Sequence, residues 1–255
     1  MPVPEGFILP KVEIEPIRKR ITKLTSRIIF KLEDRASFPL NSPIYQTGTM
    51  SLSDGSNLSF FEHATKGLEE YHGILGRWKY PGEYPLMIAV IKPVSIIDRE
   101  VTCGEAKDFP LLPPVNINIK DKLLPFYTGT LLPRLCDPTD DPNTYGETAY
   151  IDADVVELFN ERINLGRYVV LSKVDPRNKG GDEKLWDLVD KPAELDEALR
   201  DREREKDVVY GALAIAARLG LNMRLTDDLT RWIIDTTTDL EVKYLQGLAN
   251  ANLTK

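Results

Sequence analysis

Residues 199–205 carry the densest group of side chains able to do polar chemistry, with the sequence Leu-Arg-Asp-Arg-Glu-Arg-Glu. Asp201, Arg204 and Glu205 are spaced i, i+3 and i+4, so on one continuous helix they share a face that continues into apolar Val208. Charged groups on an apolar face are costly to bury unless they pair with each other or meet a ligand. A solvated helix face is the alternative interpretation of such a charge run.

Three other segments also place polar groups in line with apolar residues. Arg18 follows the isoleucine pattern of the first predicted helix. Arg162 and Lys173 are 11 residues apart, which is about three helical turns and returns both to nearly the same side. Thr237 and Glu241 form an i, i+4 pair near the C-terminus.

These four groups together would bring three guanidinium groups, one ammonium, three carboxylates and a hydroxyl into one bundle interior. The interior of a helical bundle is a common place for a site built from facing helices. The surplus of positive charge suits a compact polyanion as ligand. A buried salt-bridge network that fixes the register of the helices is the alternative.

The elements that must position these residues are predicted to be helices, because apolar residues recur at three- and four-residue steps. Gly166 inside one predicted helix indicates close packing, and Pro125 and Pro133 mark kinks or ends in another. Residues 80–115 form an irregular connecting region, in which the apolar run 86–94 could be a strand or an extended segment. We therefore predict one all-α domain over residues 1–255, a helical bundle with helices at about 13–34, 59–76, 116–135, 148–173, 192–219 and 226–249.

Composition excludes several classes of function. The net charge of −7, with Lys and Arg spread along the chain, argues against nucleic-acid binding. No apolar run is long enough to span a membrane, and the first residues, MPVPEGFILPKVEIEP, do not have the form of a secretory signal. A cytoplasmic protein is the expectation.

The cysteines and histidines do not predict a metal site. Cys103 and Cys136 lie far apart without metal-ligand spacing, so we expect both to be reduced and structural. His63 and His72 have no Cys or His neighbours with ligand spacing, and neither a metal nor another cofactor is expected.

At these residues the chain resembles the all-helical chorismate mutases of the eukaryotic, dimeric class. The segment ERINLGRYVVLSK is similar to that family's R-I-x-x-G-K/R-x-V-x-x-x-K signature, which is the most specific match. IRKRITKLTSRIIFKLEDRASFPLNSPIYQ resembles the opening helix, SFFEHATKGLEEYHGILGRWKYPGEYP the second helix and its turn, and DLEVKYL a C-terminal segment. The resemblance covers nearly the whole chain and implies the family's helical fold and a homodimer.

The resemblance also implies roles for residues. Arg18, Arg162 and Arg204 would bind the two carboxylates of chorismate, and Lys173 would touch one carboxylate and the ether oxygen. Glu205 would bind the ring hydroxyl with Asp201 beside it, and Glu241 would face the ether oxygen with Thr237 next to it. The family reaction is the rearrangement of chorismate to prephenate in phenylalanine and tyrosine biosynthesis. It is unimolecular, so the protein must hold one conformer and stabilise the charge that develops.

The positions that correspond to the family's regulatory site depart from its pattern. An Arg-Arg pair at the end of the second helix is here Gly76-Arg77, and a Gly-Ser set before the central helix is Gly146-Glu147, with Tyr150 at a Thr position. Loss of an arginine and gain of a carboxylate predict weaker capture of an amino acid's carboxylate. Two alternatives to a chorismate mutase remain open: a paralogue acting on isochorismate or aminodeoxychorismate, and a non-catalytic binding protein with the same fold.

Overall fold

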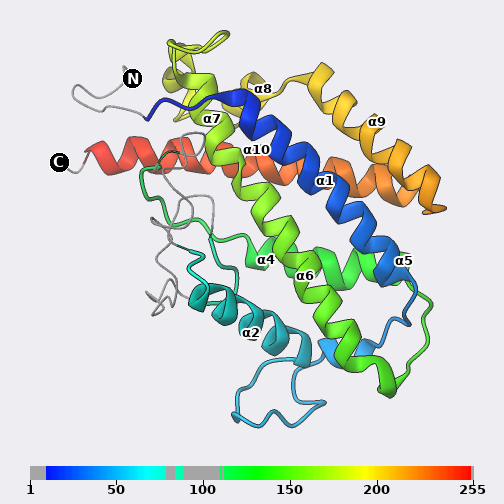
Figure 1. Ribbon diagram of the computed structural model, residues 1–255. Coiled ribbons are helices and arrows are strands. Elements are labelled where there is room, and N and C mark those ends of the chain that lie inside the picture. Colours follow the sequence, from blue (N-terminus) through cyan, green and yellow to red (C-terminus); the bar gives the residue numbers. More distant parts are fainter. Residues whose placement is uncertain (1–9, 79–83, 89–109, 111, 254–255) are drawn as a thin grey trace.

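The computed structural model describes residues 10–78, 84–88, 110 and 112–253, and within them the regular secondary structure is entirely helical (Figure 1). The helices are α1 (Ile14–Ala36), α2 (Phe60–Ile74), α4 (Lys120–Phe126), α5 (Leu132–Leu135), α6 (Tyr145–Asn164), α7 (Gly166–Val174), α8 (Pro192–Leu199), α9 (Arg202–Leu219) and α10 (Met223–Leu253). Among the described residues, none of these helices combines the length and the hydropathy needed to cross a bilayer. The predicted all-α class is confirmed.

Helix α6 is the centre of the bundle. It packs against α1 on one side and α2 on the other, and it leads directly into α7 (Figure 1). Helix α10, about 46 Å long at 1.5 Å per residue, runs across α6, α7 and α9. The apolar residues predicted to face inward, such as Ile21, Ile28 and Phe159, are buried in one shared core.

The local signals for helix ends are confirmed at two positions. Ser59 and Glu62 form a reciprocal capping box at the start of α2. Gly220 has a φ of +70°, the left-handed conformation that glycine adopts most readily, and it ends α9.

Two predicted long helices are each divided in the structure. The helix predicted over 148–173 begins at Tyr145 and is split into α6 and α7 by a turn at Leu165. The helix predicted over 192–219 ends at Leu199 and restarts at Arg202, because Arg200 has extended backbone and Asp201 is not helical either. One continuous helix was therefore the wrong prediction in both places.

The region predicted as helix over 116–135 begins only at Lys120. Pro125 lies inside α4, and a single π-helical segment, Tyr127–Leu131, separates α4 from α5. A proline lacks the N–H that a regular α-helix needs, which explains why the α-helical hydrogen-bond pattern is interrupted in this region. Of the run 86–94, the described residues 86–88 form a bend and not a strand, and the rest lies outside the described residues. Cys136 is buried and not disulfide-bonded, as expected, whereas Cys103 lies outside the described residues.

A fully buried ion pair fastens the C-terminal end of α1 to α6. Arg35 Nε lies 2.7 Å from Asp152 Oδ1, and neither side chain is exposed to solvent. The hydroxyl groups of Tyr45 and Tyr127 donate to the same carboxylate, at 2.5 and 2.6 Å. The remaining N–H groups of Arg35 donate to Tyr45 Oη and to the backbone carbonyls of residues 38–40. This pair is stable because both of its charged groups are saturated with hydrogen bonds.

Replacement of Asp152 tests that network. Asp152→Ala would leave the Arg35 guanidinium buried without its carboxylate, so the free energy of unfolding should fall by about 3–5 kcal/mol in urea denaturation. Asp154→Ala, on the same helix, removes only a partly exposed ion pair with Lys31 and should cost less than about 1 kcal/mol. Equal losses in the two variants would contradict the role given to Asp152.

Candidate active site

One pocket collects all eight residues that the sequence analysis selected as catalytic or substrate-binding. It encloses about 660 Å³, including the part open to solvent, and apolar side chains of α1, α7, α9 and α10 complete its wall. The eight residues are Arg18 from α1, Arg162 from α6, Lys173 from α7, Asp201, Arg204 and Glu205 from the start of α9, and Thr237 and Glu241 from α10.

Arg162 lies at the floor of the pocket and is 4% exposed. Its Nε donates to Thr25 Oγ1 at 3.3 Å and its Nη1 donates to Thr237 Oγ1 at 3.2 Å. Both hydroxyl groups donate in turn to carbonyls of their own helices, so they are oriented to accept from Arg162. Among the described residues, no carboxylate lies within ion-pair distance of this guanidinium.

Burial without a bonded carboxylate changes the acidity of Arg162. Its pKa is lowered to about 10, chiefly by desolvation; Glu241 opposes this shift, and the neighbouring charge of Arg204 adds to it. A buried cation in this state gains more from an added anion than an exposed one, because water does not already solvate it. Arg162 is therefore a binding group for an anionic ligand.

Lys173 and Glu241 form an ion pair on the opposite wall, with Nζ and Oε2 2.9 Å apart. Lys173 Nζ also donates to the carbonyl oxygen of Leu199 at 2.6 Å, at the end of α8. Burial raises the pKa of the Glu241 carboxyl above its ordinary value, although Lys173 and Arg162 act in the opposite direction. The sequence left this sign open, and in the structure the pKa of Glu241 is raised, so its protonated, hydrogen-bond-donating form is more accessible than that of an exposed glutamate.

Gly166 explains how α7 and α10 approach closely enough to build this wall. A Cβ added at Gly166 would lie 2.8 Å from Thr237 Cγ2 and 3.3 Å from Glu241 Cγ. The predicted close packing at this glycine is confirmed. The close packing brings Gly166 directly against Thr237 and Glu241, two of the selected residues.

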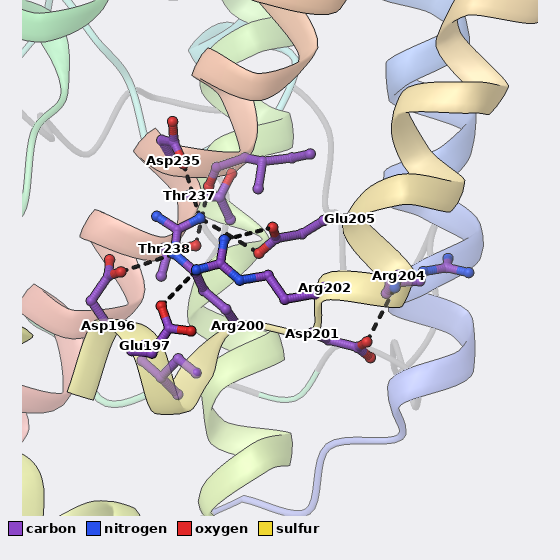
Figure 2. Close-up of polar contacts among 12 residues, drawn as sticks. Asp196, Glu197, Arg200, Asp201, Arg202, Arg204, Glu205, Asp235, Thr237 and Thr238 are labelled. Atoms are coloured by element: carbon purple, nitrogen blue, oxygen red, sulfur yellow. Dashed lines mark hydrogen bonds and ion pairs between the residues drawn. The ribbon is translucent and has the colours of Figure 1, made fainter. Parts of the chain in front are cut away.

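Asp201 does not share a helix face with Arg204 and Glu205, in contrast to the prediction. Its backbone is not helical, and its side chain caps α9 by accepting from the N–H of Arg204 at 3.1 Å. An N-cap residue lies outside the helix, so the i, i+3, i+4 relation does not apply to it. Figure 2 shows the Arg204 side chain turned away from Glu205, and it also lines a neighbouring groove of α1 that contains Thr22 and Thr25.

Glu205 is held by two arginines that the sequence analysis did not select. Arg200 Nη1 lies 3.5 Å from Glu205 Oε1, and Arg202 Nη1 lies 3.3 Å from Oε2 (Figure 2). Neither arginine lies on the apolar pattern that drew attention to the others. Their contacts with Glu205 depend on the break between α8 and α9. In the sequence, the residue that could have indicated this break is Asp201, because aspartate is a preferred N-cap residue.

Arg18 lines the mouth of the pocket, and 40% of its side chain is exposed, compared with 29% for Lys173. Its Nη1 pairs with Glu15 at 2.9 Å. The pocket thus has a buried guanidinium, that of Arg162, at its inner end and a solvent-accessible one, that of Arg18, at its entrance. This arrangement can bind a small dianion with one anionic group deep and another near the entrance.

The three positions considered for regulation are not brought together within one chain. Arg77 lies against Glu157 and Glu161 on α6, whereas Gly146 and Glu147 are exposed at the start of that helix. The intervening ten or more residues of α6 correspond to about 15 Å. Among the described residues, no group of three or more His, Cys, Asp or Glu could hold a metal ion.

Comparison with known proteins agrees with this geometry. Residues 144–242, which contain α6, α7, α8, α9 and most of α10, match the family profile "Chorismate mutase type II". The chorismate mutase of Schizosaccharomyces pombe is 28% identical over 173 residues, which cover 66% of this chain and 64% of that protein. In sequence, this chain is similar to the chorismate mutases. Chorismate mutase 1 (chloroplastic) of Petunia hybrida is 27% identical over 91% of this chain and 74% of its own length.

The likeness extends to the three-dimensional structure. A solved structure of the chorismate mutase AtCM1, with tyrosine bound in its allosteric site, superposes with a TM-score of 0.71. It is 26% identical and covers 91% of this chain and 95% of that one. The fold predicted from the resemblance to eukaryotic chorismate mutases is confirmed.

Gly166 allows a test of the pocket wall. Gly166→Ala should lower the free energy of unfolding by about 1–3 kcal/mol, because the new methyl group overpacks Thr237 and Glu241. Gly211→Ala is a matched control in α9, where an added Cβ meets nothing within 4 Å, and it should raise stability by about 0.5–1 kcal/mol through helix propensity. Urea denaturation measures both, and a stabilised Gly166→Ala variant would disprove the close contact.

Proposed function

We propose that this protein is a chorismate mutase that rearranges chorismate to prephenate in phenylalanine and tyrosine biosynthesis. The observation that carries the proposal is the buried Arg162, which has hydroxyl but no carboxylate partners and lies in the same pocket as the Lys173–Glu241 pair. Such a site offers a strong anion-binding group beside a hydrogen-bond donor. It is suited to a dicarboxylate that reacts within itself.

The reaction requires positioning and electrostatics and no covalent catalyst. Chorismate must adopt a folded, chair-like conformer in which the two ends of the rearranging system meet. Two anchored carboxylates select that conformer, which removes part of the entropic barrier. As the ether C–O bond breaks, negative charge grows on the oxygen, and a fixed donor stabilises it more than it stabilises the ground state.

We assign the roles within the pocket from the resemblance and the contacts. Arg162 binds the deep carboxylate of the substrate, and Arg18 and Arg204 bind the outer one. Lys173 and Glu241 donate to the ether oxygen. Glu205 accepts from the ring hydroxyl. Thr237 holds Arg162, and Asp201 caps the helix that carries Arg204 and Glu205.

We further propose a cytoplasmic homodimer in which residues 1–255 form one domain. Support for a dimer comes from large apolar residues left exposed on helices that pack on α6 and on α6 itself. Tyr71, Ile74 and Leu75 at the end of α2 are 36–57% exposed, and Phe30 on α1 and Tyr150 on α6 are 52% and 60% exposed. Compared with the regulatory pattern that the resemblance implies, this chain lacks one arginine and carries Glu147, so we propose weak control by tyrosine or tryptophan.

The activity is tested by following the loss of chorismate absorbance on addition of the purified protein, with the product identified by chromatography. The proposal expects prephenate, with a rate that changes little on addition of tyrosine or tryptophan. Isochorismate and aminodeoxychorismate are assayed in parallel, since both keep the two carboxylates. Preferential turnover of either would replace the proposed substrate. Binding without turnover between pH 5 and 8 would favour a non-catalytic binding protein.

The raised pKa of Glu241 predicts how the rate depends on pH. If protonated Glu241 donates to the ether oxygen, the rate of the parent enzyme falls as pH rises through that pKa, because the carboxylate cannot donate. Glu241→Gln carries a donor at every pH, so its activity should stay level where that of the parent declines. The two profiles of kcat/KM are measured between pH 5 and 9. Profiles of identical shape would refute the role of Glu241 as a donor.

A further inference from the structure

The two-residue break between α8 and α9 touches two of the residues placed in the active site. The carbonyl oxygen of Leu199, at the end of α8, accepts from Lys173 Nζ at 2.6 Å. The next side chain, Arg200, forms an ion pair with Glu205. A shift of this short segment would therefore move Lys173 and Glu205 together.

Arg200 is held in place from three helices. Its Nε donates to Asp196 Oδ2 on α8 at 2.9 Å, and its Nη1 donates to Asp235 Oδ1 on α10 at 2.9 Å and faces Glu205 Oε1 on α9 at 3.5 Å (Figure 2). Its side chain is 12% exposed, so the guanidinium itself is better shielded than that of an ordinary surface arginine, while the Asp235 side chain is 62% exposed. A guanidinium fixed by two short hydrogen bonds presents its charge to the third carboxylate in one geometry.

Arg202 takes the other oxygen of Glu205 but is a weaker restraint. Its Nη1 lies 3.3 Å from Glu205 Oε2 and its Nη2 lies 2.6 Å from Glu197, yet its side chain is 53% exposed. Exposed pairs of this kind contribute little rigidity because solvent competes for both charges. Of the two arginines, Arg200 is the one that can fix Glu205.

We propose that Arg200 is a positioning residue for the rearrangement: clasped between Asp196 and Asp235, it orients the Glu205 carboxylate toward the ring hydroxyl of the substrate. Arg200 does not line the active-site pocket and touches no substrate atom; it lines an adjoining basic cavity, and Glu205 forms part of the wall of both. The proposal rests on the proposed function, because it assigns Glu205 a substrate contact.

A double-mutant cycle in kcat tests the proposal. Misplacement of a positioning group by about 1 Å can cost on the order of 100-fold in rate, so Arg200→Gln should lower kcat by about 10- to 100-fold. KM for chorismate should change by less than about threefold, because the carboxylate-binding arginines remain. In a Glu205→Gln background, Arg200→Gln should add less than about threefold, because residues that act as a unit are non-additive.

Arg231→Gln is the matched control. Arg231 lines the same adjoining cavity but pairs with Asp227 on its own helix, so kcat should stay at the level of the parent. Thermal unfolding of each variant checks that it is folded. If Arg200→Gln does not fold, the cycle is run with Arg200→Lys, which keeps the charge but loses the planar fork, with the same non-additivity expected.

Three results would overturn the positioning role: a kcat for the Arg200 variant equal to that of Arg231→Gln, a loss confined to KM, or a loss that multiplies undiminished in the Glu205→Gln background. Failure of the proposed function looks different, because the parent protein itself would then not convert chorismate.

Discussion

The structure of this site depends on one buried guanidinium that has no carboxylate partner among the described residues. Arg162 is surrounded by helices α1, α6 and α10, and it donates only to hydroxyl groups of Thr25 and Thr237. A buried arginine is ordinarily stabilised by a paired acid, as Arg35 is by Asp152 in the same bundle. Arg35 already has its carboxylate and is therefore part of a structural ion pair. Arg162 has none among the described residues, so we infer that a ligand supplies its anionic partner.

The other parts of the bundle keep that group in place and give it a partner for chemistry. Gly166 allows α10 to approach α7, so that Thr237 reaches Arg162 and Glu241 reaches Lys173. The break before α9 turns Glu205 toward the pocket and leaves the Leu199 carbonyl free to hold Lys173. Small departures from regular helices therefore shape the site, while the regular helices supply its rigidity.

Sequence periodicity was sufficient to predict the helical class, most helix positions and the eight pocket residues. It succeeded because apolar residues at helical spacing identify the buried face, and Arg18, Arg162 and Lys173 interrupt that face. It failed at Leu165 and Arg200, where the residues themselves favour helix and only tertiary packing selects a turn or an extended backbone. Asp201 carried a usable signal as an N-cap residue, but Arg200 carried none, because its three acidic partners come from separate helices.

The most direct test of the account is the affinity for prephenate, the dicarboxylate product, measured by titration calorimetry for the parent protein and for Arg162→Met. Methionine fills a similar space without charge, so the fold and the other cations should be retained. Loss of one partner of a buried charge pair costs about 2–5 kcal/mol, and the account therefore predicts that Kd rises by roughly 30-fold or more. An Arg162→Met protein that binds prephenate as tightly as the parent would contradict it.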